Sequence, residues 1–218
     1  PPPPPPPPFF FQADAGIRSS VASRGLGDVY KRQLMQFVSV DAYGKRAEYI
    51  RDGLDFNYMM DNVEEFLDRI PVRNSITFIC TYNNLSITSM DKLLDKILEL
   101  RKKYSKTYQR VWFDVPLLRQ PEWQQITLLP ESYQVIHEAN IDYMKDNSGE
   151  ANGLHIFKDF EIQKMQRNLA YWRENADAST QNKRNFYAFF NEHDRRRLTR
   201  FLNTFPEMEE FWKECMDA

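Results

Sequence analysis

Hydroxyl, amide and carboxylate side chains gather where three short apolar segments of the sequence end. The segments are MQFVSVDA, SITFICTY and RVWFDVPLL, and each has the length and the β-branched content of a buried strand. In open or partly closed α/β sheets, ligands bind beyond the carboxyl ends of the strands. Ser, Thr and Asn side chains at that edge can orient the hydroxyl, amino and carboxylate groups of a small ligand. The candidates are Ser39, Asp41, Thr81, Asn83, Asn84 and residues 114–118.

One basic residue suits the same edge. Arg51 follows the first strand by one short helix, and its guanidinium can pair bidentately with a carboxylate. Each candidate also has an ordinary structural role. Ser39 can fill a strand, Asn83 and Asn84 can form a turn, and Arg51 can lie on a solvated helix face. The pattern alone leaves both interpretations open.

Helical periodicity fills the gaps between the apolar segments. Val63, Phe66, Leu67 and Ile70 recur at the spacing of one amphipathic helix face, and residues 90–104 repeat that pattern. Strands alternating with helices at this spacing predict right-handed βαβ units in a parallel sheet, and therefore an α/β fold. The expected strands are 35–42, 75–82 and 110–118, and the expected helices are 46–54, 59–70 and 90–104.

Local signals predict where several elements begin and end. Gly53 can end the first helix, and Thr88 with Asp91 three residues later resembles a capping box for helix 90–104. After Pro130 the sequence becomes mostly helical. Further helices are expected at 131–147, at 158–176 and, with a break near Pro206, at 182–216.

Charge and cysteine content exclude several classes of protein. Residues 34–218 carry a net charge of −4, which gives no reason to expect a nucleic acid or a membrane surface as partner. No apolar run approaches the roughly 18 residues of a membrane-spanning helix. The two cysteines, Cys80 and Cys215, form no CxxC pair, so neither a disulfide framework nor a zinc site is expected. A reducing cytoplasm is the expected compartment.

Two further groups of residues favour structural interpretations. His137, His155 and His193 show neither HxxxH nor HExxH spacing, so no metal site is expected. The basic stretch 193–200, HDRRRLTR, is more typical of a solvated helix face with local ion pairs than of a nucleic-acid site.

The first 33 residues have no hydrophobic period and follow a run of eight prolines. Reverse translation of residues 28–33, DVYKRQ, resembles a transposon end used in sequencing libraries, and residues 12–19 resemble a flow-cell adapter. We therefore expect residues 1–33 to be a non-native, disordered tail, the alternative being a genuine N-terminal arm. An adapter fused directly before a strand also predicts that the natural protein is longer and that this chain is its back half.

The remaining sequence resembles a known enzyme family. VSVDAYGKRAEYIRDGLDFNYMMDNVEEFL is similar to the fourth strand and helix of radical S-adenosylmethionine enzymes of the branch with SPASM or twitch C-terminal domains. FICTYNNLSITSMDKLLDKILELRKKY resembles the fifth strand and helix, and VWFDVPLLRQPEWQQITLLP resembles the sixth strand. RNFYAFFNEHDRRRLTRFLNTFPEMEEFW is similar to the C-terminal part of one such group. The resemblance covers nearly all of residues 34–218.

This resemblance implies a partial (β/α)6 barrel, similar to a TIM barrel. Residues 34–130 would form its second half, and residues 131–218 a helical, twitch-like region. In the family, a CxxxCxxC loop holds a 4Fe–4S cluster, and an external donor reduces it. S-adenosyl-L-methionine is then cleaved to a 5′-deoxyadenosyl radical, which abstracts a hydrogen from the substrate; peptides are common substrates in this branch. By carry-over, Ser39 and Arg51 would hold the methionine carboxylate, Asn83 and Asn84 the ribose, and Leu117 and Leu118 the adenine.

The chain also departs from the family. It has no CxxxCxxC, so it cannot build the catalytic cluster, and Cys215 alone cannot hold an auxiliary one. This chain alone should be catalytically inert. It should also expose a sheet edge at residues 35–41, and unpaired strand edges favour poor solubility or oligomers. The alternative function is a non-enzymatic α/β interaction module that meets a protein partner through the helix of Arg195–Arg197 and exposed aromatic side chains.

Overall fold

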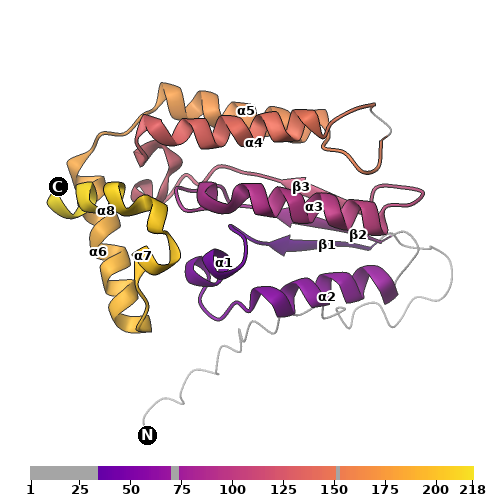
Figure 1. Ribbon diagram of the computed structural model, residues 1–218, viewed down its shortest axis with the longest axis horizontal. Coiled ribbons are helices and arrows are strands. Elements are labelled where there is room, and N and C mark those ends of the chain that lie inside the picture. Colours follow the sequence, from indigo (N-terminus) through magenta and orange to yellow (C-terminus); the bar gives the residue numbers. More distant parts are fainter. Residues whose placement is uncertain (1–33, 70–73, 151–152) are drawn as a thin grey trace, which may run out of the picture.

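The computed structural model describes residues 34–69, 74–150 and 153–218 (Figure 1). The expectation of a disordered tail at residues 1–33 concerns a segment that lies outside the described residues. Within them, no helix is long and apolar enough to cross a membrane.

Three parallel strands form one sheet in the order β1-β2-β3. They are β1 (Leu34–Ser39), β2 (Asn74–Ile79) and β3 (Val111–Asp114). The chain between β1 and β2 forms α1 (Lys45–Ile50) and α2 (Phe56–Arg69), and α3 (Met90–Tyr104) connects β2 to β3. The predicted α/β class and the predicted parallel sheet are confirmed. Each strand ends earlier than expected, because its last residues belong to the loops that leave the sheet.

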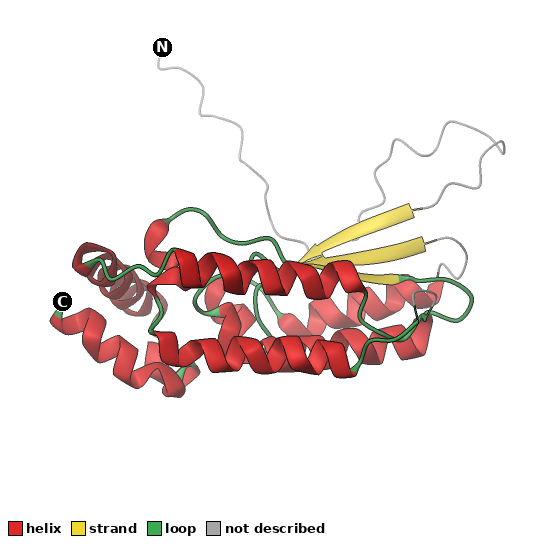
Figure 2. Cartoon of the chain, turned by 90° about the horizontal axis from the view of Figure 1, so that it is seen from above, coloured by secondary structure: helices red, strands yellow, loops and turns green. Residues whose placement is uncertain are grey.

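In the part of the chain that the structure describes, helices cover one face of this sheet and leave the other uncovered (Figure 2). Ile76 and Phe78 of β2 and Phe113 of β3 point to the helices and are buried. Alternate residues point to the other face, which we call the open face, because side chains alternate along a strand. On it, Phe37, Thr77 and Trp112 lie side by side in the strand register. The prediction that residues 35–42 form a buried strand is wrong for β1, since the side chain of Phe37 is 56% exposed.

The amphipathic helices α2 and α3 pack against the covered face, as their periodicity predicts. Their apolar stripes are buried: Val63, Phe66, Leu67, Leu93, Leu94, Ile97 and Leu98. The predicted capping box of α3 is wrong. Ser89, not Thr88, is the N-cap, and its Oγ accepts a hydrogen bond from the N–H of Tyr43. The hydroxyl of Thr88 donates instead to the carbonyl of Leu85.

The C-terminal part is helical, as predicted, and forms two groups. The first contains α4 (Gln134–Asp146) and α5 (Asp159–Glu174), which lie beside one another along α3 and β3 (Figure 1). The second contains α6 (Thr180–Arg197), α7 (Phe201–Thr204) and α8 (Glu209–Asp217), which cluster next to α1. Within the described residues, short 3-10 turns lie between several elements of the chain: Ser86–Ser89, Glu122–Gln124, Ile126–Leu128, Glu131–Tyr133 and Pro206–Met208. The last long helix breaks first at Leu198, in the left-handed region with φ 55°, and not only near Pro206.

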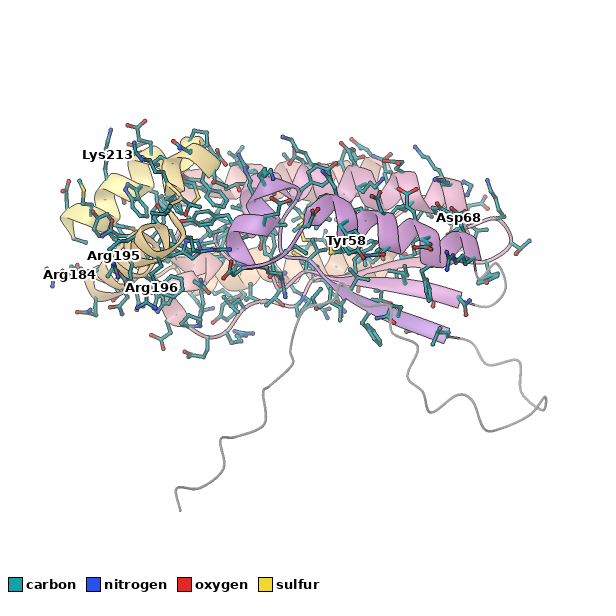
Figure 3. All side chains as sticks on the ribbon, turned by 90° about the horizontal axis from the view of Figure 1, so that it is seen from below. Tyr58, Asp68, Arg184, Arg195, Arg196 and Lys213 are labelled. Carbon is teal, nitrogen blue, oxygen red and sulfur yellow. The ribbon has the colours of Figure 1, made fainter. Side chains whose placement is uncertain are left out.

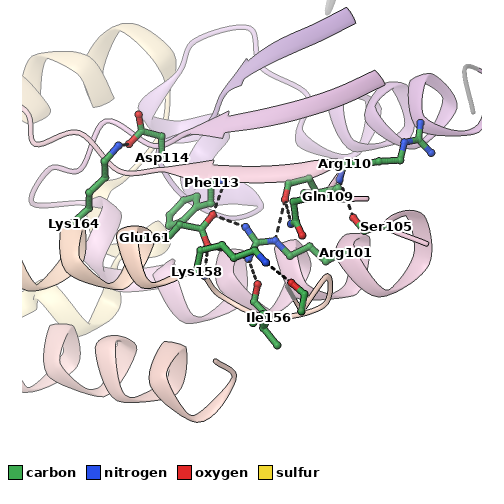
Figure 4. A network of polar contacts seen from close by, with 12 residues as sticks. Arg101, Ser105, Gln109, Arg110, Phe113, Asp114, Ile156, Lys158, Glu161 and Lys164 are labelled. Atoms are coloured by element: carbon green, nitrogen blue, oxygen red, sulfur yellow. Dashed lines mark hydrogen bonds and ion pairs between the residues drawn. The ribbon is translucent and has the colours of Figure 1, made fainter. Parts of the chain in front are cut away.

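Among the described residues, side chains and not a fourth strand occupy the outer edge of β3 (Figure 4). Arg101 of α3 donates through Nε to the carbonyl of Val111 at 3.0 Å. Glu161 of α5 accepts from the N–H of Phe113 at 3.1 Å, and Asn168 donates to the carbonyl of Val115, directly after β3. Arg101 and Glu161 are themselves joined by a fully buried ion pair at 2.6 Å. Side chains of α3 and α5 therefore bond to two carbonyls and one N–H group on this side and occupy the place of a further strand.

We expect Arg101→Met to lower the free energy of unfolding by about 3–5 kcal/mol, because it leaves the Glu161 carboxylate buried without its cation. Urea unfolding followed by circular dichroism measures the change. The matched control is Lys213→Met, which removes an exposed ion pair with Glu209 and should leave the urea midpoint nearly unchanged. Equal midpoints for Arg101→Met and the wild type would contradict this role of the pair.

Candidate functional site

A buried carboxylate joins the carboxyl ends of β1 and β2. Asp41, two residues after β1, is 6% exposed. One of its oxygens accepts from Nε of Arg51 at 2.7 Å, and the other accepts from the N–H of Thr81 at 3.1 Å. Two charge-assisted bonds of this kind hold the Asp41 side chain in one orientation. Asp41 thus fixes Arg51 next to the end of β2.

Arg51 keeps part of its guanidinium available. Its side chain is 38% exposed, and within the described residues only Nε is hydrogen-bonded, to Asp41. The backbone N–H of Arg51 closes the last turn of α1 by bonding to the carbonyl of Ala47. A guanidinium held at Nε and open at its two terminal nitrogens can present a fork to a carboxylate. This is the arrangement that an anion-binding arginine needs.

Ser39 ends β1 on the open face, in register with Ile79 of β2 and Asp114 of β3. Asp114 forms an ion pair with Lys164 of α5, which reaches the end of β3 from the side (Figure 4). Two strand spacings separate Ser39 from Asp114, a distance of about 10 Å. The carboxyl end of the open face therefore carries a hydroxyl at one border and an ion pair at the other.

Asn83 and Asn84 have mainly structural partners. The side-chain oxygen of Asn83 accepts from the N–H groups of Leu85 and Ser86, and its amide nitrogen donates to the carbonyl of Thr81. These bonds form a turn that starts with an asparagine side chain. Asn84 is fully buried and donates to the carbonyl of Trp123. Among the described residues its side-chain oxygen has no hydrogen-bond partner.

Leu117 and Leu118 lie directly beside the end of β2. Leu117 forms an isolated parallel bridge with Tyr82, and the N–H of Leu118 donates to the Tyr82 carbonyl at 2.9 Å. Both leucines are half-buried. An apolar contact surface thus continues the sheet past the last hydrogen-bonded strand residues.

All six candidates from the sequence lie at the carboxyl end of the sheet or in the loops that leave it: Ser39, Arg51, Asn83, Asn84, Leu117 and Leu118. Hydrogen bonds connect Arg51 to the end of β2 through Asp41, and Leu118 to Tyr82. No hydrogen bond among the described residues joins Ser39 to Arg51 or to Asn83. Their common location does not by itself identify a ligand.

A buried histidine, His137, is hydrogen-bonded to Tyr82 at this end of the sheet. The hydroxyl of Tyr82 lies 2.7 Å from Nδ1 of His137, and Nε2 of His137 lies 2.9 Å from the carbonyl of Met165. Because a carbonyl only accepts, Nε2 carries the proton and Nδ1 accepts from Tyr82. Burial lowers the pKa of His137 and raises that of Tyr82. Both groups are thus neutral and structural.

The two cysteines of the sequence do not suit an iron–sulfur cluster. No group of three His, Cys, Asp or Glu side chains that could hold a metal occurs in the described part of the chain. Cys80 and Cys215 are buried, and burial raises the pKa of both thiols, that of Cys215 to about 12. Thiolates are the form that binds iron, so neither side chain fits this role.

The basic stretch is neutralised locally, as predicted. Arg195 and Arg196, which are exposed on α6 (Figure 3), both form ion pairs with Glu192 at 2.6 Å. Arg197 pairs with Asp52 and donates to the carbonyl of Tyr49, so it attaches α6 to the region of α1.

Sequence reasoning missed three residues that organise the site: Arg101, Glu161 and Lys164. A signal for the first two is present. Arg101 continues the buried stripe of α3 one turn beyond Ile97, and Glu161 adjoins Ile162 in the stripe of α5. Opposite charges within two apolar stripes indicate a buried pair. Nothing in the sequence indicates that Lys164 meets Asp114.

Comparison of this chain with protein-family models, with curated proteins and with solved structures finds no match.

We expect stability to fall as the pH is lowered from 7.5 to 5.5. The unfolded chain binds a proton at His137 near pH 6.5, whereas burial lowers the pKa of the folded form, so protonation favours unfolding. One such group contributes a slope of at most about 1.4 kcal/mol per pH unit. Urea unfolding of His137→Gln across this range should show a smaller slope than the wild type. His155→Gln is the matched control, because His155 is exposed; an unchanged slope in His137→Gln would contradict the assignment.

Proposed function

We propose that this chain is the S-adenosyl-L-methionine-binding half of a radical S-adenosylmethionine enzyme, with residues 34–130 as half of a partial (β/α)6 barrel. The observation that carries the proposal is the asymmetry of the sheet. Helices cover one face, and side chains of α3 and α5 occupy the outer edge of β3. The open face and the outer edge of β1 have no covering element among the described residues. A barrel wall has this arrangement, with helices outside and strands continuing on one side.

The site chemistry agrees with this proposal. Arg51 would pair with the methionine carboxylate through the nitrogens that Asp41 leaves available, and the Ser39 hydroxyl would donate to the same group. Leu117 and Leu118 would provide an apolar surface for the adenine. Asn83 and Asn84 contribute less in this conformation, because the Asn83 amide closes a turn and Asn84 is buried.

The cofactor chemistry needs groups from outside this sequence. When reduced, a 4Fe–4S cluster supplies the electron that converts S-adenosyl-L-methionine to a 5′-deoxyadenosyl radical. Its three thiolates cannot come from Cys80 and Cys215, so a separate segment with CxxxCxxC must provide them. The proposal also includes an external electron donor, a substrate that is unknown and for which a peptide is one class, and a reducing cytoplasm.

A direct test measures binding of S-adenosyl-L-methionine to this chain by equilibrium dialysis. We expect Arg51→Met to weaken binding at least about tenfold, because a hydrogen bond to a charged group contributes roughly 1.5–3 kcal/mol. Arg69→Met is the matched control. Arg69 ends α2, is exposed and pairs with Glu65, so its loss should leave binding unchanged. No binding by the wild type, or an equal loss in both variants, would overturn the proposed site.

The reaction itself requires the complete gene. The upstream coding sequence should encode CxxxCxxC, and the complete protein should form 5′-deoxyadenosine after anaerobic reconstitution with iron, sulfide and a reductant. Product should disappear when a cysteine of that loop is changed to alanine and fall in Arg51→Met. A complete gene without the three-cysteine loop, or a reconstituted protein that forms no 5′-deoxyadenosine, rules the enzyme out.

A second candidate function is a non-enzymatic interaction module. One observation favours it: Met35 and Phe37 are exposed together on the open face, next to the strand edge that no other described strand covers. Strand addition to such an edge is a common mode of peptide recognition. The dialysis experiment separates the two candidates, because an interaction module has no reason to bind S-adenosyl-L-methionine through Arg51.

A further inference from the structure

The outer edge of β1 presents an ordered row of backbone groups. The N–H of Val40, directly after β1, donates to the carbonyl of Ile79. The backbone N–H and C=O groups of the even-numbered residues of β1 therefore point toward β2. Met35, Phe37 and Ser39 therefore direct their N–H and C=O groups outward. Figure 3 shows β1 at the border of the described structure. The Phe37 carbonyl accepts a hydrogen bond from the side-chain amide of Gln36 at 3.1 Å, so that side chain must turn away when a strand is added. With that change, the three residues form a template for an additional strand.

The residues of this edge carry no protection against self-association. Strand β1 reads LMQFVS and contains no charged side chain and no proline, which are the usual means of blocking an edge. No like charges on β1 itself therefore oppose the pairing of two such strands. Leu34, Met35 and Phe37 are 43%, 46% and 56% exposed, so pairing would also bury apolar surface.

We propose that β1 pairs antiparallel with β1 of a second copy of this chain, with Gln36 opposite Gln36 of that copy. A twofold axis perpendicular to the sheet keeps the open faces of both copies on the same side. This requires odd-numbered residues of one β1 to lie opposite odd-numbered residues of the other, and even opposite even. In this register, Phe37 meets Met35 of the second copy on the open face, and Leu34 meets Val38 on the covered face. Apolar side chains thus pair with apolar ones, and the two amides meet at the axis.

The closed edge of β3 determines the size of the assembly. Each copy has one free edge among the described strands, because the side chains of Arg101, Glu161 and Asn168 occupy the other. Edge pairing therefore stops at two copies. It gives a six-stranded sheet and not a growing fibre. This separates the proposal from general aggregation, which has no fixed size.

The proposal goes beyond the enzyme function and does not depend on it. The two share one edge, since a complete barrel would place its preceding strand next to β1. Their failures are distinguishable, because self-association is measured without S-adenosyl-L-methionine and its binding is measured through Arg51.

Two variants test the dimer on the full chain by sedimentation equilibrium. The wild type should be dimeric, and Phe37→Lys should be monomeric with an unchanged circular dichroism spectrum, because the side chain is already exposed. Tyr58→Lys is the matched control. Tyr58 is also 56% exposed but lies on α2, so this variant should remain dimeric. A monomeric wild type, an open series of larger species, or a dimeric Phe37→Lys would overturn the proposal.

A cysteine scan tests the register. Non-hydrogen-bonded antiparallel pairs place their Cα atoms about 4.5 Å apart, within disulfide range. Gln36→Cys should therefore form a covalent dimer on mild oxidation. Val38→Cys should not, because its counterpart is Leu34. The native cysteines are buried and should not interfere. Failure of Gln36→Cys to cross-link, or stronger cross-linking by Val38→Cys, would overturn the register.

Discussion

The buried ion pair between Arg101 and Glu161 decides where the sheet ends. Both side chains are fully buried, so removing the two charges from water costs free energy. The attraction between them repays that desolvation cost only when the remaining polar atoms are also hydrogen-bonded. The protein supplies these hydrogen bonds: Arg101 also bonds to the carbonyls of Val111 and Ile156, and Glu161 to the N–H groups of Phe113 and Lys158. The pair is therefore better understood as a substitute for a strand than as a source of net stability.

The asymmetry of the sheet follows from this substitution. Because side chains of α3 and α5 occupy the outer edge of β3, a strand can be added to the described sheet at β1. The same α5 carries Lys164 to Asp114, so it also forms a charged border to the open face. A wall with one closed edge and one free edge suits part of a barrel, and it equally suits pairing of two copies. Both proposals thus depend on one feature of β3.

Sequence patterns predict the type and bounds of several helices and strands better than the burial of their side chains. Residues 90–104 were expected as a helix and form α3 with those bounds, since its apolar stripe is long and regular. Exposure of β1 contradicts its apolar composition, because burial depends on what covers a strand, and composition does not specify that. The break at Leu198 lacks a glycine or proline signal. There, Asp194 accepts from Thr199 and from the N–H of Phe201, and these bonds redirect the chain.

For the candidate residues, too, the sequence predicts the location but not the contacts. Their placement at one end of the sheet follows from topology alone, but the partners of each side chain do not. Asp41 and Arg51 are ten residues apart and meet because α1 is short. A helix of six residues is too short to be stable alone. The C-terminal helices hold it: Tyr49 donates to Asp194 at 2.7 Å, and Arg197 donates to the carbonyl of Tyr49. The position of Arg51 therefore depends on residues near 194–197, so the helical region supports the site without contributing a candidate ligand.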